Sequence, residues 1–147
     1  MLDTNILIDY LGRRESFFVQ AERIVAAGFF GNVTLWMAAQ SPKDACYVLE
    51  RYTSSQRIQQ ALLETCHIIT PVALTADDLT RAARLQWDDY RDCLVAIAAQ
   101  KAGADYLITR DAKGFDRSMV PAISPAAWLD LMEGKGLVYD AGAFPKN

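Results

Sequence analysis

The chain has 147 residues, 52% of them apolar, and a formal net charge of −3, which is enough for one domain with a hydrophobic core. No stretch contains the roughly 20 apolar residues of a membrane span, and Asp3 and Asp9 interrupt the N-terminal apolar run where a signal peptide would carry none. The three cysteines form no CxxC pair, which argues against a disulfide framework or a zinc site. We therefore expect a soluble cytoplasmic protein without a membrane segment.

The net charge bears on nucleic-acid binding but does not decide it. Phosphate contacts usually come with a basic surface, so −3 argues mildly against such a partner. A bound cation reverses the local sign, and setting aside four metal-binding acids would change the net charge from −3 to +1. The bulk charge therefore leaves RNA or DNA binding open.

The first half of the chain alternates short apolar runs with longer helical patterns. Ser41, Pro42 and Asp44 supply a capping serine, a proline at the first helical position and an acid in the first turn, which is typical of a helix start. The predicted elements are a very short strand at 1–2, helices over 6–11 and 17–28, a strand at 33–37, and helices over 42–53 and 55–65.

The second half repeats this alternation. The near-continuous apolar run from Tyr90 to Ala102 predicts a helix buried on most sides, and Gly103 supplies its C-terminal stop. The other predicted elements are a strand at 67–70 stopped by Pro71, a helix from a Thr75 cap to Leu85, strands at 106–109 and 122–124, and a helix begun at Pro125. Strands separated by helices indicate an α/β fold with a mainly parallel sheet.

Four acids fall where a parallel sheet collects ligand sites. Asp3 and Asp111 lie at the ends of predicted strands. Asp44 lies in the first turn of the helix after the strand at 33–37, and Asp92 lies in the first turn of the helix that begins at Tyr90. Strand C-termini and helix N-termini lie at the same edge of such a sheet, so the four carboxylates are predicted to converge. A cluster without His or Cys needs a cation and suits Mg²⁺ or Mn²⁺. Such a site predicts metal-dependent phosphoryl transfer, above all phosphodiester hydrolysis.

Each acid also has a simpler explanation when it is considered alone. Asp44 and Asp92 could serve as caps or helix-dipole partners, and Asp3 and Asp111 as turn residues. Their joint placement is what favours the metal site. Asp9 is expected on a solvent-exposed face of a helix and is left outside the site. His67, the sole histidine, is interpreted as structural.

The residues around these acids resemble the PIN-domain family of small metal-dependent nucleases over about residues 1–130. The matching blocks are MLDTNILIDYL (1–11), SPKDACYVLER (41–51), DYRDCLVAIAAQKAGADYLITRD (89–111) and AISPAAWL (122–129). The last two blocks are most similar to the subgroup whose third motif reads D-[FY]-x-D. The resemblance implies one three-layer α/β/α domain over 1–133, with 134–147 as an unassigned tail. Family members usually have a longer first strand, so this strand is short here or the natural start lies upstream.

By this resemblance, Asp3, Asp44, Asp92 and Asp111 match the catalytic, metal-binding acids. The second acid of the family is usually Glu, so Asp44 is a shorter substitute and Glu50 is the competing candidate. Other matched positions are Asp89 as a supplementary ligand, Asn5 and Thr109 as small polar residues that help hold the site, and Arg91, Arg110 and Lys113 as phosphate contacts, of which Arg110 and Lys113 could equally be solvated turn residues.

The resemblance extends to stand-alone PIN domains that act as VapC-like toxins of bacterial toxin–antitoxin pairs. It implies a Mg²⁺- or Mn²⁺-dependent endoribonuclease, a homodimer, and a small antitoxin protein that plugs the acidic groove. The alternative is a non-catalytic PIN-like module that binds RNA or protein. A haloacid-dehalogenase-like phosphatase is disfavoured because its mechanism needs a second Asp where this chain has Asn5, which cannot donate a proton in that way.

Overall fold

The computed structural model describes residues 1–140 and 142. Its strands are β1 (Leu35–Ala38), β2 (Ile69–Val72), β3 (Leu107–Ile108) and β4 (Ala122–Ile123), and they form two parallel pairs, β1 with β2 and β3 with β4. Leu2 joins the pairs, because it bridges in parallel to Met37 on one side and to Ile108 on the other. The predicted first strand is therefore a single fully buried bridging residue at the centre of a parallel sheet.

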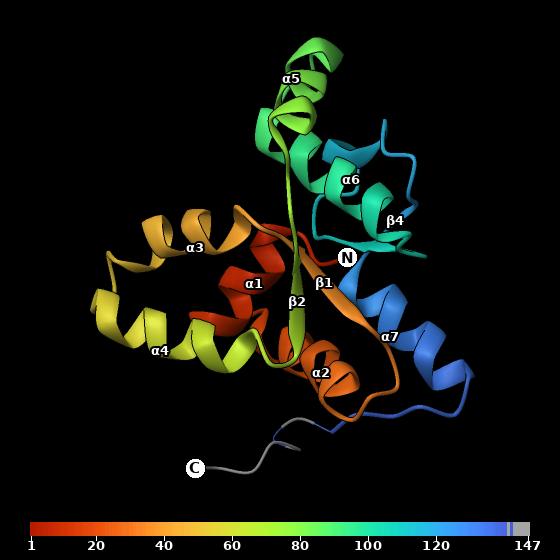
Figure 1. The fold of residues 1–147 in the computed structure, drawn as a ribbon. Coiled ribbons are helices and arrows are strands. Elements are labelled where there is room, and N and C mark those ends of the chain that lie inside the picture. Colours follow the sequence, from red (N-terminus) through yellow and green to blue (C-terminus); the bar gives the residue numbers. More distant parts are fainter. Residues whose placement is uncertain (141, 143–147) are drawn as a thin grey trace.

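Helices cover both faces of this sheet (Figure 1). Successive strand residues face opposite sides, so Leu35 and Met37 join the core with α1, α2 and α7, whereas Ala38 joins the core with α6. The expected three-layer α/β/α domain is confirmed. The helices are α1 (Thr4–Leu11), α2 (Phe18–Phe29), α3 (Ser41–Leu49), α4 (Ser55–Thr65), α5 (Ala76–Leu85), α6 (Tyr90–Ala102), α7 (Pro125–Gly134) and the short 3₁₀ helix η1 (Lys113–Phe115).

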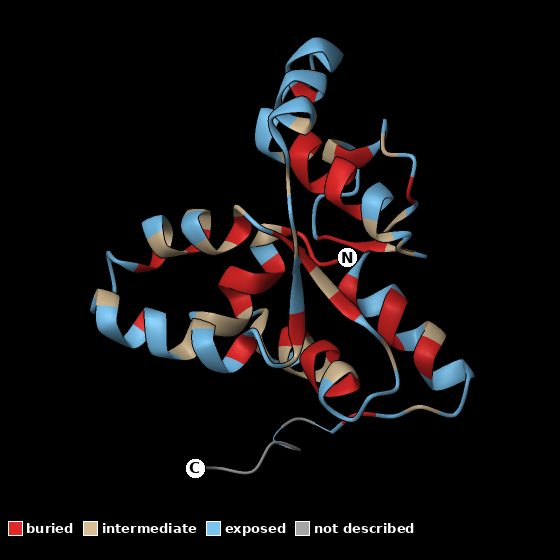
Figure 2. Ribbon diagram, in the orientation of Figure 1, coloured by how far each residue is buried: buried red, intermediate tan, exposed pale blue. Residues whose placement is uncertain are grey.

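Helix α6 is the most buried helix and has the bounds that the sequence predicts (Figure 2). Residues 93–99 are all buried, because the helix packs on the sheet, on α5 and on η1. Asp89 caps its start by accepting the backbone N–H of Arg91, and Gly103 ends it with a φ of 63°, a left-handed conformation that suits glycine. The capped ends position the first turn of α6 at the C-terminal edge of the sheet.

Helix α3 differs from the prediction at both ends. Gln40 occupies the cap position, and Ser41 is the first helical residue with its fully buried hydroxyl 2.8 Å from that of Thr4. Ser41 therefore joins α3 to α1 instead of capping α3. The helix ends at Leu49 and not at 53, and the residues after it form a turn in which the backbone N–H groups of Tyr52 and Thr53 donate to the Leu49 carbonyl.

Pro71 does not stop β2, which was predicted to end before it. The strand runs through Pro71, which pairs with Met37 of β1. Because β2 is at the edge of the sheet and pairs with β1 alone in the described residues, the missing N–H of proline costs no ladder hydrogen bond.

Beyond α7 the chain returns to the core. Tyr139 is 5% exposed, its carbonyl accepts a hydrogen bond from Arg23 Nε at 2.6 Å, and its hydroxyl bonds Asn32 Oδ1 at 3.2 Å. The rest of the predicted tail, 141 and 143–147, lies outside the described residues. None of the helices in the described part of the chain is long and apolar enough to cross a membrane.

Candidate active site

The C-terminal edge of the sheet carries the four predicted acids. Asp3 follows the bridging Leu2 and is the cap residue of α1, and Asp111 follows β3 after two residues. Asp44 lies in the first turn of α3, and Asp92 lies in the first turn of α6. Because the strands are parallel, each acid enters from a different element at the same edge.

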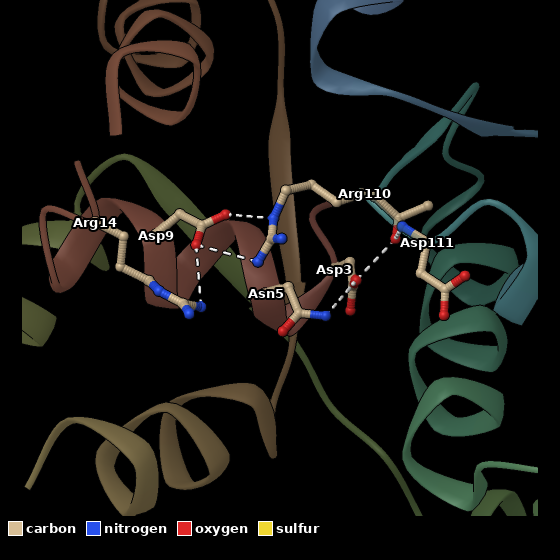
Figure 3. Close-up of polar contacts among 7 residues, drawn as sticks. Asp3, Asn5, Asp9, Arg14, Arg110 and Asp111 are labelled. Atoms are coloured by element: carbon tan, nitrogen blue, oxygen red, sulfur yellow. Dashed lines mark hydrogen bonds and ion pairs between the residues drawn. The ribbon is translucent and has the colours of Figure 1, made fainter. Parts of the chain in front are cut away.

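Asp3 is a buried carboxylate held by its neighbours (Figure 3). It is 2% exposed, and its Oδ2 accepts hydrogen bonds from Thr109 Oγ1 at 2.8 Å and from Asn5 Nδ2 at 3.4 Å. Burial raises the pKa of Asp3 above its usual value, while these hydrogen bonds oppose the rise. The two small polar residues singled out in the sequence therefore both contact the first acid.

Thr109 connects two of the acids. Its hydroxyl is fully buried, donates to Asp3 and accepts the backbone N–H of Asp111 at 2.9 Å. One oxygen atom therefore sets the end of β3 relative to Asp3, although Asp3 and Thr109 are 106 residues apart in the chain.

Asp92 shows most directly that the acids face one another. Its pKa is raised from 3.8 to about 7, first by burial and then by the negative charges of Asp3, Asp89 and Asp111, with Arg91 opposing the rise. Three other acids thus act on one carboxyl group. Like charges at this spacing make the site unfavourable until protons or cations neutralise it.

Gly114 is a site residue that the sequence analysis missed. A Cβ at this position would lie 2.8 Å from Asp111 Oδ2 and 3.1 Å from Asp92 Oδ2, so both carboxylates converge on the space that glycine leaves free. The Gly114 N–H also donates to Asp111 Oδ1 at 3.1 Å. The pattern D-x-x-G, three residues beyond the last acid, is the signal that could have indicated it.

Asp44 and Glu50, the two candidates for the second acid, lie at opposite ends of α3. The hydrogen bond and charge of Asp89 raise the pKa of Arg91 at the start of α6, and the charge of Asp44 adds to this rise. Exposed Glu50 follows the last turn of α3, where its charge adds to the rise that burial causes in the pKa of the Cys46 thiol. Asp44, and not Glu50, therefore acts on a residue in the first turn of α6, where Asp92 also lies.

Three of the remaining predicted residues lie beside the acids. Arg91 forms an ion pair with Asp89 at 2.8 Å, which lowers the pKa of that carboxyl group. Asp89 and Lys113 line a cavity of about 430 Å³ together with Asp92, Asp111 and Gly114. Arg91 and Lys113 therefore both lie next to acids of the site.

Arg110 and Asp9 differ from the sequence-based expectation. Asp9 was expected on a solvated helix face, yet it is 1% exposed, and Arg110 Nε donates to its Oδ2 at 2.7 Å. Figure 3 shows the Arg110 side chain extending toward α1, while Asp111 points the other way. A buried carboxylate needs a partner, so Asp9 takes the guanidinium that was predicted to contact a phosphate.

The acids fit a hard divalent cation in charge and ligand type. The donors are carboxylate oxygens, the ligands that Mg²⁺ and Mn²⁺ prefer, and a cation would relieve the repulsion seen at Asp92. In the described part of the chain, no three carboxylate, imidazole or thiol side chains are already grouped closely enough to hold an ion. Two of the carboxylates, those of Asp92 and Asp111, border the space that Gly114 leaves free.

Comparisons with known proteins agree with this architecture. Residues 1–113 match the PIN domain. A solved structure titled "Structure of FitAB bound to IR36 DNA fragment" contains a chain with the same fold, at a TM-score of 0.53 and 16% identity over 84% of this chain and 93% of that one. No curated protein matches the sequence. Because the match spans most of the chain, and the acids lie at the expected edge, the protein belongs to the PIN-domain family.

Proposed function

We propose that this protein is a Mg²⁺- or Mn²⁺-dependent endoribonuclease that hydrolyses RNA phosphodiester bonds. The observation that carries the proposal is the convergence of the Asp92 and Asp111 carboxylates on the space beside Gly114, where burial and the charges of three other acids raise the pKa of Asp92 to about 7. An enzyme that binds a divalent cation through carboxylates requires such a concentration of negative charge. Membership of the PIN-domain family supports the same chemistry.

In this proposal Asp3, Asp44, Asp92 and Asp111 hold the cation, with Asp89 as a supplementary ligand. When bound, the divalent cation supplies Lewis-acid activation of water and stabilises negative charge on the phosphate. Thr109 and Asn5 keep the Asp3 carboxylate in place. Lys113 and Arg91 lie beside the acids and would hold a phosphate of the substrate there.

The test is degradation of a labelled single-stranded RNA in Mn²⁺, Mg²⁺ or EDTA. Wild-type protein should cleave only with a divalent cation, and Asp92→Asn should lose at least about 10–100-fold in rate, since changing even the groups that support a metal ligand costs that much. The matched control is Asp130→Asn, which removes an exposed acid of α7. Cleavage in EDTA, or full activity of Asp92→Asn, would contradict the mechanism.

We further propose that the enzyme is a homodimeric toxin, neutralised by a small antitoxin protein that covers the acids. The similarity to VapC-like toxins supports this role, and the fold is shared with a chain of FitAB, a complex named as bound to DNA. Expression in a bacterial host should arrest growth for the wild type but not for Asp92→Asn, and co-expression of a small neighbouring gene should relieve the arrest. Purified protein should have twice the 16.3 kDa chain mass in solution.

The alternative is a PIN-like module that binds RNA or protein without catalysis. It predicts that Asp92→Asn and wild type bind the same partner equally well with EDTA present, and that neither cleaves RNA. The labelled-RNA experiment therefore separates the two functions.

A further inference from the structure

We infer that Asp9 holds the Arg110 guanidinium away from the acidic cluster, so that the cluster keeps the negative charge needed for a divalent cation. The inference rests on the proposed metal-dependent function and concerns how the same site is kept available. In this role Asp9 is a positioning residue: it contacts neither metal nor substrate and acts through Arg110.

Asp9 and Arg110 form two hydrogen bonds that are largely buried. Arg110 donates from Nε to Asp9 Oδ2 at 2.7 Å and from Nη2 to Asp9 Oδ1 at 3.3 Å, a two-pronged pair between residues 101 apart in sequence. The Asp9 side chain is 1% exposed and that of Arg110 is 27% exposed. Arg14 adds a second positive charge at 3.5 Å from Asp9.

Phe17 holds the same guanidinium from another side. The Arg110 Cζ atom lies 3.9 Å from the centre of the Phe17 ring, a distance at which a cation is attracted to the ring face. Asp9 of α1 and Phe17, the residue before α2, thus form one binding site for the Arg110 side chain.

This binding site matters because Arg110 is adjacent in the chain to residues of the acidic cluster. Arg110 stands between Thr109, which bonds Asp3, and Asp111. A guanidinium binds carboxylates in a bidentate manner and stays charged at any physiological pH, so a free Arg110 would pair with a neighbouring acid and compete with a cation. As the side chain lies, the guanidinium donates to Asp9, and Figure 3 shows it extending away from Asp111.

The experiment compares Mn²⁺ binding by titration calorimetry among four variants and the wild type. Asp9→Asn removes the negative charge that holds the Arg110 guanidinium. The variant should bind Mn²⁺ about tenfold more weakly, because the freed guanidinium repels Mn²⁺ and pairs with the carboxylates that would bind it. Arg110→Met and the double variant Asp9→Asn/Arg110→Met should bind Mn²⁺ as the wild type does. The matched control, Lys101→Met, removes an ion pair with Asp78, which is not one of the acids of the site, and should leave Mn²⁺ affinity unchanged.

The double variant separates this role from simple support of the fold. A merely structural pair predicts that losing both partners is at least as harmful as losing one, whereas competition predicts recovery. Thermal unfolding is measured in parallel, because replacing a buried ion pair by apolar or neutral groups often costs little stability. Wild-type affinity in Asp9→Asn, or no recovery in the double variant, would overturn the inference.

A second route covers the case in which Asp9→Asn does not fold. Phe17→Leu removes the ring beneath Arg110 and should weaken Mn²⁺ binding by a smaller factor, but not in an Arg110→Met background. An equal loss in both backgrounds would overturn the inference. A wild-type protein that binds no Mn²⁺ would instead refute the proposed metal-dependent function and, with it, this inference.

Discussion

At Asp92, burial and neighbouring charges act together on one carboxyl group. It lies in the first turn of a buried helix, where its negative charge interacts favourably with the helix dipole. Burial and three neighbouring acids outweigh that favourable position, and its pKa rises to about 7. The residue is therefore partly protonated at neutral pH in the metal-free protein, and its charge is costly there.

The first prediction concerns the pH dependence of stability. Unfolded Asp92 loses its proton near its ordinary value of 3.8, and folded Asp92 near 7, so its contribution to the free energy of unfolding falls as pH rises between these values. The melting temperature of Asp92→Asn relative to metal-free wild type should therefore increase steadily from pH 4 to pH 7. Thermal melts in EDTA across this range measure it, and a constant difference would contradict the raised pKa.

The second prediction concerns Gly114. Gly114→Ala places a methyl group 2.8 Å from Asp111 Oδ2 and 3.1 Å from Asp92 Oδ2, so at least one carboxylate must move. We expect Mn²⁺ affinity and RNA cleavage to fall about tenfold or more while the fold persists, since site residues tolerate little misplacement. Gly134→Ala is the control, because a Cβ there meets nothing within 4 Å. Equal behaviour of the two variants would exclude a role for Gly114.

Secondary-structure elements were predictable where local chemistry determines their ends. Helix α4 has the predicted bounds, and α5 begins with a capping box in which Thr75 and Asp78 bond each other's backbone N–H groups. Prediction failed where contacts distant in sequence intervene, as when the Ser41 hydroxyl bonds Thr4 or β2 continues through Pro71. Propensity describes a short window of residues and carries no information on such partners.

The third prediction tests the cap of α5. Thr75→Ala removes the side-chain acceptor for the Asp78 N–H and should lower the free energy of unfolding by about 1 kcal/mol. RNA cleavage should remain unchanged, because Thr75 contacts none of the four acids. Thr80→Ala, within the same helix, is the control and should not destabilise it, since alanine has the higher helix propensity. Urea unfolding of both variants measures the difference, and equal midpoints would contradict the capping role.

At the scale of the whole molecule, the net charge of −3 opposes binding of a polyanion. Several acids lie at one edge of the sheet, where the negative charges of three of them raise the pKa of Asp92. A divalent cation at this edge would reverse the local sign and attract phosphate. The composition alone could not reveal this, because it reports the sum of the charges and not their positions.

The fourth prediction follows from this distribution. Asp130→Asn, which keeps every site acid, should bind a non-cleavable single-stranded RNA analogue at least about tenfold more tightly in Mn²⁺ than in EDTA. Asp92→Asn should show a smaller increase, because it holds the cation less well. Fluorescence anisotropy measures both affinities. Binding that is equally tight in EDTA would favour the non-catalytic module.

The sequence by itself determined the alternation of strands and helices and the four acids at strand ends and helix starts, because periodicity, caps and chain direction are local properties. Only the tertiary structure decided that Asp44 and not Glu50 acts on the first turn of α6, and that Gly114 leaves room for two carboxylates. It also placed Asp9 in the interior beside Arg110. Those outcomes depend on which distant side chain can satisfy a buried charge, and pairing across 101 residues follows from packing rather than from local pattern.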